Sequence, residues 1–290
     1  FLQLLFLIKN IGFIYYLIPF ISVIDNKYGL FFSILFGRKM FKIKLQGYMI
    51  NFTKSQLLVM VDFIGVLRYC TSFKITSDRK IHLTLDLKHT FSISLDDMSI
   101  EDENLIKTLF YGLRFGANFE TKKINFDEYR DKTLVIIEEN GKKIIETSKG
   151  IKFYIDSIHP GNSIIETFVR KIHLMNPNLD FKDKVVVDVG AECGDTPLYF
   201  AGLGAKVFAF EPVKQHYDDM MRNISLNPKL SKNIIPINAG IGKDGHLIFY
   251  QDGSGIIGST SFIENVHGKD AKELKVKGLS LESALKEYNI

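Results

Sequence analysis

The sequence predicts an α/β protein whose C-terminal half is a parallel sheet covered by helices, preceded by a smaller α+β region. After Gly150, helical segments alternate with short, continuously apolar segments, which is typical of parallel strands buried on both faces. Before Gly150, shorter segments alternate apolar and polar residues, as half-buried strands do. We therefore expect an apolar N-terminal helix in residues 1–30, an α+β region of unknown role in 31–150, and a domain with a parallel sheet in 151–290.

The composition is that of an ordinary globular protein. A length of 290 residues suggests about two domains, and 46% hydrophobic with 24% charged residues argues against a disordered or fibrous chain. The 37 basic and 33 acidic residues give a net charge of +4 that is spread along the chain, so we expect no nucleic-acid partner. Cys70 and Cys193 lie far apart, which predicts neither a disulfide framework nor a zinc site and favours a reducing, cytoplasmic location.

The first 24 residues are almost wholly apolar, with a single charge at Lys9. Their length is close to the roughly 20 residues of a membrane-spanning helix, but Asn10 and Pro19 disfavour an uninterrupted helix in lipid. Three interpretations stay open: a buried or interfacial helix, which we favour, a membrane span, or a signal-like segment. Membrane association through residues 1–24 therefore also stays open.

Residues 31–150 read as short strands and helices without recognisable chemistry. The segments KMFKIKL, FKIT, KIHLTLDL and TFSISL have the period of half-buried strands, and Glu101–Tyr111 has a helical pattern. The pair Asn140-Gly141 stands between two apolar segments, which predicts a β-hairpin.

The informative segment begins at residue 163. We expect a helix over Ser163–Met175 and then a buried strand at Val185–Val189, followed by a tight loop bracketed by Gly190 and Gly194. The next helix is expected to be capped by Asp195 or Thr196, with Pro197 in its first turn. A second strand, Ala205–Phe210, ends at Glu211.

Strand, glycine loop, helix, strand and terminal acid, in this order, form a unit that binds an adenosine-containing cofactor. Glu211 follows Gly190 by 21 residues, the interval expected for an acid that hydrogen-bonds ribose hydroxyls. Glu192 occupies the second glycine position of a dinucleotide loop, where it would repel a pyrophosphate by on the order of a kcal/mol. Asp188 adds a second acid.

S-adenosylmethionine has no phosphate and carries an ammonium and a sulfonium, so this charge pattern favours the methyl donor. The alternative is that Asp188 and Glu211 only cap helices and that Glu192 faces solvent.

Past Pro212, an amphipathic helix ends near Pro228 and is followed by a third strand. Asn238, at the carboxyl end of that strand, either serves the adenine edge or forms a turn. We expect His216, on the preceding helix, to be a surface residue.

The segments VVVDVGAECGDTPLYFAGLGAKVFAFEP, RNISLN, INAGIG and VKGLSLESAL resemble the FkbM-type family of S-adenosylmethionine-dependent methyltransferases, over about residues 150–290. The resemblance implies a Rossmann-like class I sheet and methyl transfer to a hydroxyl of a sugar, glycan or secondary metabolite. It places cofactor contacts at Asp188, Gly190, Ala191, Gly194, Glu211 and Asn238, and we add the loop residue Glu192. The pair Glu192-Cys193 departs from the family, in which Asn-Ile or a similar pair is more usual.

The ending also departs from the family. Family members continue past the helix that corresponds to Leu281–Tyr288 into further strands, whereas this sequence stops at Ile290. We therefore expect a truncated C-terminal part, with an open, apolar edge at Lys184–Val189.

No general base can be assigned. Asp252, His267 and His159 are candidates by residue type only, and no metal-ligand cluster is visible. The cofactor we expect is S-adenosylmethionine, with no metal and with a small-molecule or glycan acceptor. A nicotinamide-dependent oxidoreductase and a non-catalytic binding protein remain alternatives.

Overall fold

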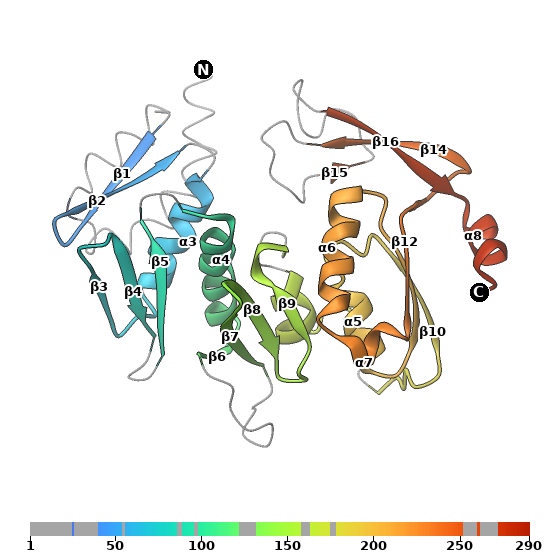
Figure 1. Ribbon diagram of the computed structural model, residues 1–290, viewed down its shortest axis with the longest axis horizontal. Coiled ribbons are helices and arrows are strands. Elements are labelled where there is room, and N and C mark those ends of the chain that lie inside the picture. The colour runs from blue at the N-terminus through green and yellow to red at the C-terminus, as the bar shows by residue number, and fades with distance from the viewer. Residues whose placement is uncertain are drawn as a thin grey trace. The chain divides into compact units, whose positions relative to one another are not determined.

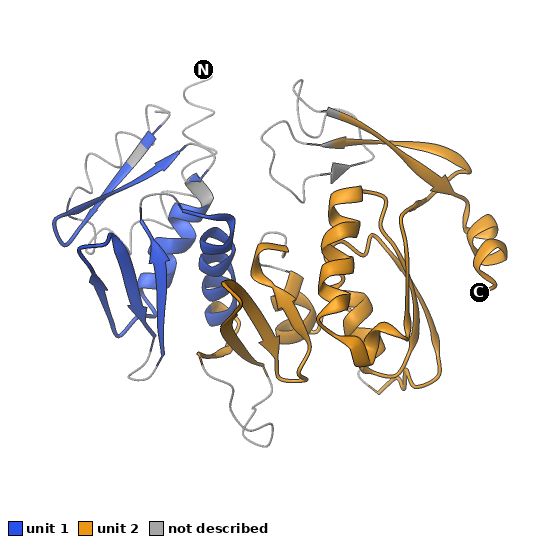
Figure 2. Ribbon diagram, in the orientation of Figure 1, with its two compact units in different colours: residues 1–113 blue, residues 114–290 orange. Residues whose placement is uncertain are grey.

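The computed structural model divides into two compact units, residues 1–113 and 114–290 (Figure 2). It describes residues 25, 40–53, 56–85, 89–95, 98–121, 132–157, 163–174, 178–251, 260–261 and 272–290. These residues form a mixed α/β protein with several sheets and helices (Figure 1). The helix expected within residues 1–30 falls outside the described residues, apart from Asp25. Within the described ranges, no helix has the length and apolar character needed to cross a membrane.

In its described residues, unit 1 contains two antiparallel sheets and two helices. Its described elements are β1 (Met40–Leu45), β2 (Tyr48–Thr53), α3 (Leu57–Leu67), β3 (Ser72–Ile75), β4 (Lys80–Thr84), β5 (Thr90–Ser94) and α4 (Ile100–Arg114), whose last residue belongs to unit 2. The order β3-β4-β5 pairs Ile81 with Ile93 and Leu83 with Phe91, and all four side chains are buried. The predicted period-2 strands and the helix near residues 101–111 are confirmed.

The first sheet of unit 2 crosses residue 150, where we expected a domain boundary. Its strands, in the order β6-β7-β8-β9, are β6 (Asn118–Glu120), β7 (Thr133–Glu139), β8 (Lys142–Thr147) and β9 (Lys152–Tyr154). Residues 114–150 belong to the unit that carries the glycine loop because β8 pairs with β9. The hairpin predicted at Asn140-Gly141 joins β7 to β8, and both residues have positive φ, 53° and 72°, as a type I′ turn requires.

The helix expected over Ser163–Met175 is shorter than predicted. It follows the 3₁₀ turn η3 (Ile155–Ser157), starts at Ser163 and continues as the π-helical turn η4 (Ile165–Arg170). Lys171 adopts a left-handed conformation with φ 55°, and Ile172 N–H donates to the Glu166 carbonyl. This wide closing turn ends the helix before Met175.

The second sheet of unit 2 is parallel, as predicted. Its order is β10 (Val185–Val189), β11 (Lys206–Phe210) and β12 (Ile234–Ile237). The connections contain α5 (Asp195–Gly202), α6 (Lys214–Ser225) and α7 (Pro228–Ser231), which lie on one side of the sheet (Figure 1). The pairs Val189↔Phe210 and Phe210↔Ile237 align the carboxyl ends of all three strands. Side chains that follow these strands therefore gather at one edge.

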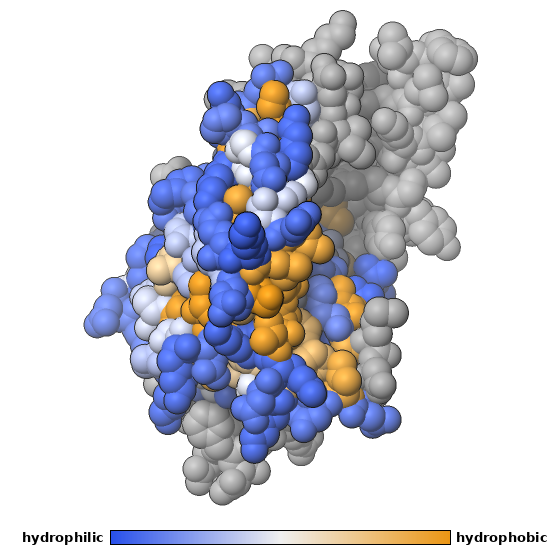
Figure 3. Space-filling model, turned by 90° about the vertical axis from the view of Figure 1, so that its right-hand side faces the viewer, coloured by the Kyte–Doolittle hydropathy of each residue, from blue (hydrophilic) through white to orange (hydrophobic). Residues whose placement is uncertain are grey.

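The strand predicted at Val185–Val189 forms and, among the described strands, has the open, apolar edge that we expected, but the expectation that it is buried is wrong. Among the described strands β10 pairs with β11 alone, and the relative exposures of Val185 and Val189 are 54% and 57%. Because no described strand lies on the other side of β10, the side chains of these two valines have no neighbouring strand to cover that flank. Viewed from the side of α8 (Leu281–Tyr288), the molecule shows a group of apolar side chains (Figure 3).

A third sheet completes unit 2, in the order β13 (Gly240–Ile241), β16 (Lys272–Leu279), β14 (Gly245–Gln251) and β15 (Thr260–Ser261). Strand β16 is antiparallel to β14 and leads into α8, whose Ala284 joins the buried cluster around Phe208 and Phe210. The helix expected at Leu281–Tyr288 is confirmed. Because β13 follows β12 directly, this sheet extends from the carboxyl edge of the parallel one.

Two buried amides, one in α6 and one at the start of α7, hold this segment against the first sheet and the glycine loop. Asn223 is fully buried; its Nδ2 donates to the Cys193 carbonyl at 2.8 Å, and its Oδ1 accepts from Tyr154 N–H and the Ser157 hydroxyl, both at 3.0 Å. One turn later, Asn227 Oδ1 accepts from Lys152 N–H at 2.9 Å, and its Nδ2 donates to the Lys152 carbonyl at 2.8 Å. These bonds fix β9, α6 and the loop relative to one another.

We predict that Asn223→Ala lowers the stability of unit 2 by about 2–4 kcal/mol, because a buried donor and two buried acceptor contacts are lost together. Urea unfolding, with hydrogen exchange of β9 and α6 as the local measurement, checks this. Gln215→Ala, at an exposed position of the same helix, should change stability by less than about 0.5 kcal/mol. Equal effects of the two substitutions would contradict the role given to Asn223.

Candidate functional site

The glycine loop after β10 turns sharply toward α5. Gly190 N–H and Ala191 N–H both donate to the Phe210 carbonyl, at 2.8 and 3.0 Å, and Gly194 N–H donates to the Ala191 carbonyl at 2.7 Å. Gly190 and Gly194 have φ of 86° and 85°, in the left-handed region that side chains disfavour. At Gly194 a Cβ would also lie 3.0 Å from Met220 Cγ. The loop therefore needs glycine at both ends, as the sequence suggested.

Glu211 ties the loop to the start of α6. Its side chain is almost fully buried; Oε1 accepts from Val213 N–H at 2.8 Å, and Oε2 accepts from Glu192 N–H at 2.9 Å. Burial raises the pKa of Glu211, and the two backbone hydrogen bonds partly oppose this rise. A carboxylate oxygen has two lone pairs, so each oxygen can accept a further hydrogen bond from a ligand.

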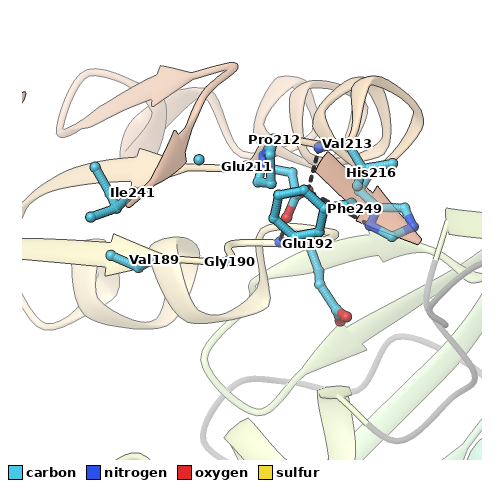
Figure 4. Close-up of a pocket in the computed structure, with 10 residues that line it drawn as sticks. Val189, Gly190, Glu192, Glu211, Pro212, Val213, His216, Ile241 and Phe249 are labelled. Carbon is cyan, nitrogen blue, oxygen red and sulfur yellow. Dashed lines mark hydrogen bonds and ion pairs between the residues drawn. The ribbon is translucent and has the colours of Figure 1, made fainter. Parts of the chain in front are cut away.

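A pocket opens between the carboxyl edge of the parallel sheet and the third sheet (Figure 4). It is lined by Val189, Gly190, Glu192, Glu211, Pro212, Val213, His216, Gly240, Ile241 and Phe249. Apolar walls with a few polar groups are the usual composition of a small-molecule site, and this edge is where open α/β sheets bind ligands. Of the seven residues predicted for the site, Gly190, Glu192 and Glu211 line this pocket.

Asp188 and Ala191 support the loop without lining the pocket. Asp188 Oδ2 accepts from the Thr196 hydroxyl at 2.7 Å. Burial raises the pKa of Asp188 to about 6; the Thr196 hydrogen bond opposes this rise and the charge of Asp195 adds to it. Ala191 is buried, with a relative exposure of 1%. Asp188 thus lies just before the loop and Ala191 within it, and neither is among the residues that line the pocket.

The prediction that Asp195 or Thr196 caps α5 is wrong. The capping position is Gly194, whose left-handed turn directs the next two side chains inward. The Asp195 carboxylate accepts a hydrogen bond from the Thr167 hydroxyl, and Thr196 donates to Asp188. Both side chains therefore link α5 to neighbouring elements instead of to its own backbone.

Glu192 is surrounded by other carboxyl groups. Burial raises its pKa to about 7, and the negative charges of Asp195, Glu211, Glu166 and Asp188 contribute in that order. Such a setting disfavours an anionic ligand and favours a cationic one. Across the ranges that the structure describes, no group of three or more His, Cys, Asp and Glu residues is arranged to hold a metal ion.

The side-chain amide of Asn238 donates hydrogen bonds to the backbone. Its Nδ2 donates to the carbonyls of Glu211 at 2.7 Å and of Pro212 at 3.2 Å. It therefore holds the turn that carries Glu211, and it is not among the residues that line the pocket.

The expectation that His216 is a surface residue is wrong. Its relative exposure is 2%, it lines the pocket, and its Nδ1 lies 3.7 Å from Glu211 Oε1. A signal was present in the sequence, because His216, Met220 and Asn223 recur at the spacing of one helix face, and all three are buried. Phe249 and Ile241 were also missed, since strand alternation predicts that Phe249 points inward without telling what it faces.

The three candidate bases, His159, Asp252 and His267, lie outside the described residues. Comparison of this chain with protein-family models and with curated proteins finds no match to either.

We predict that Glu192 makes the stability of unit 2 depend on pH. Because its folded-state pKa of about 7 lies above the ordinary 4.5, its stabilising contribution is full below about pH 4.5 and is lost as the pH rises through 7. Relative to Glu192→Gln, the protein should therefore lose about 2 kcal/mol of stability between pH 5 and pH 7.

Urea unfolding at several pH values, with hydrogen exchange of α5, measures this difference. Glu282→Gln, which removes an exposed carboxyl on α8, serves as the control and should follow the unsubstituted protein. Parallel pH curves for the protein and Glu192→Gln would rule out the raised pKa.

Proposed function

We propose that this chain is an S-adenosylmethionine-dependent methyltransferase of the FkbM type, with a Rossmann-like class I sheet. The observation that carries the proposal is the convergence of Gly190, Glu192 and Glu211 on one pocket at the carboxyl edge of the parallel sheet. The resemblance of residues 150–290 to that family supports the proposal, and a hydroxyl of a sugar, glycan or secondary metabolite is the proposed acceptor.

The described residues fit the adenosine part of this cofactor. The Glu211 carboxylate can accept hydrogen bonds from two ribose hydroxyls beside those from Val213 and Glu192. Pro212, Ile241 and Phe249 supply the apolar surface that a flat purine ring requires. Gly190 has no side chain to separate a ligand from the loop, and a Cβ built there meets nothing within 4 Å.

The charge of the site supports the methyl donor over a dinucleotide. When bound, the cofactor supplies an electrophilic methyl group on a positively charged sulfur. Burial raises the pKa of Asp188, Glu192 and Glu211, so the site already resists holding negative charge. The two negative charges of a pyrophosphate would add to this repulsion, whereas a cation would relieve it.

In this proposal the residues around the pocket position the methyl donor, and the hydroxyl that accepts the methyl group must be aligned with it. Displacement at a methyl group runs in line, so most of the catalytic effect is expected from orientation. The acceptor hydroxyl also has to lose its proton during transfer.

Calorimetric titration with S-adenosylhomocysteine, and separately with NADH, tests the cofactor. We expect micromolar binding of S-adenosylhomocysteine alone. Binding of NADH alone would replace the proposal by a nicotinamide-dependent oxidoreductase. Binding of neither ligand would favour a non-catalytic protein that keeps the fold.

We predict that Glu211→Gln weakens S-adenosylhomocysteine binding by about 1–3 kcal/mol, because a charged acceptor for the ribose hydroxyls becomes neutral and one of the two oxygens that accept from Val213 and Glu192 N–H becomes an NH2 donor. Asp188→Asn should weaken binding by a similar amount if its carboxylate serves the cofactor directly, and far less if it only holds Thr196. Calorimetry measures both, and circular dichroism confirms that the variants are folded. If Glu211→Gln bound S-adenosylhomocysteine with unchanged affinity, Glu211 would not be the residue that binds the ribose.

A further inference from the structure

Glu192 lines the pocket, and its carboxylate lies apart from that of Glu211, the acid that we assign to the ribose hydroxyls. Its backbone N–H is fixed by Glu211 Oε2 at 2.9 Å, and its own φ is 41°. Its side chain extends away from Glu211, His216 and Phe249 (Figure 4). The pocket therefore carries two acids with separate orientations, and only Glu211 has both side-chain oxygens in backbone hydrogen bonds that the structure shows.

Four carboxyl groups from four different elements act on Glu192. Asp188 comes from β10, Asp195 from α5, Glu166 from η4 and Glu211 from the end of β11. His216 on α6 lies beside Glu211, and His173 acts on Asp188 and Asp195. The charges that act most strongly on Glu192 itself are the four carboxylates. An ionised Glu192 thus stands in a negative environment that a bound cation would neutralise.

We propose that Glu192 is a specificity residue that makes the pocket prefer the cationic methyl donor over its neutral, demethylated product. This inference rests on the proposed function, because it takes the pocket to be the cofactor site.

The charge difference between donor and product follows from the reaction. As the acceptor oxygen forms a bond to the methyl carbon with its lone pair, the carbon–sulfur bond breaks and its electron pair stays on sulfur. The sulfonium becomes a neutral thioether, and the acceptor hydroxyl gives up its proton to a base or to water. The cofactor therefore loses one positive charge on turnover, and a carboxylate near it loses its attraction for the product.

The preference for the donor over the product should be accompanied by the release of a proton from Glu192. The pKa of Glu192 lies at about 7 in the ligand-free protein, so the group is about half protonated at neutral pH. A cation nearby favours the charged carboxylate, so donor binding should expel a proton from Glu192. Binding of the neutral product should expel far less.

The test is calorimetric titration of the protein and of Glu192→Gln with S-adenosylmethionine and with S-adenosylhomocysteine at pH 7. The glutamine keeps the backbone N–H that Glu211 accepts and removes only the charge. Each titration is repeated in buffers of different ionisation enthalpy, which gives the number of protons released. Glu282→Gln, at an exposed position on α8, is the matched control for the loss of one carboxylate.

We expect the protein to prefer the donor and Glu192→Gln to lose about tenfold of that preference, the order of effect for one charge on another at several ångströms in a protein site. The affinity for S-adenosylhomocysteine should change little. Proton release on donor binding should be about half a proton in the protein and near zero in Glu192→Gln. Glu282→Gln should behave as the unsubstituted protein does.

The outcomes separate the two proposals. If neither ligand binds the protein, the proposed function and this inference fail together. If both ligands bind and Glu192→Gln keeps the full preference and the proton release, only the role of Glu192 is overturned. Should the variant fold poorly, the buffer dependence in the unsubstituted protein decides the matter, because equal proton release by donor and product would overturn the inference.

Discussion

The buried carboxylate of Glu211 is the interaction on which the site depends. A charge removed from water must be hydrogen-bonded, and Glu211 finds its partners in the backbone of two different segments, at Val213 and at Glu192. One side chain at the end of β11 thereby fixes both the start of α6 and the glycine loop after β10. The pairing of Val189 with Phe210 sets the distance that this carboxylate has to bridge.

Hydrogen bonds from α6 and the residues after it connect the glycine loop to the first sheet of unit 2. The Asn223 amide joins the Cys193 carbonyl of the loop to the backbone of β9, and Asn227 makes a second pair of bonds to Lys152. Because these amides are buried, water cannot take over their hydrogen bonds, and removing an amide leaves buried backbone groups without a partner, which lowers stability. The sheet that begins at residue 118 is thus part of the support of the pocket, although its sequence carries no chemistry of its own.

The acids around the loop lower the stability of the folded protein, and the same acids favour the binding of a cation. Glu211 is buried and Asp188 and Glu192 are partly buried; the charge of Asp188 makes ionisation of Glu211 more costly, and the charges of Glu211 and Asp188 make ionisation of Glu192 more costly. For folding alone, a neutral residue in place of Glu192 would cost less than a partly buried carboxyl group beside four others. The charge pattern is understandable if the pocket exists to receive a cation, and this reasoning underlies both proposals.

The sequence by itself determined the strands of the parallel sheet, the turn at Asn140-Gly141, the glycine loop and the position of Glu211, because runs of apolar residues and glycines with positive φ act locally. The tertiary structure decided which side chains meet. It buried His216 in the pocket, exposed Val185 and Val189, turned Asp195 and Thr196 inward, and placed the Asn238 amide on the backbone of Glu211 and Pro212. Each of these depends on what another segment presents at that point, and a pattern along one chain segment does not contain its packing partner.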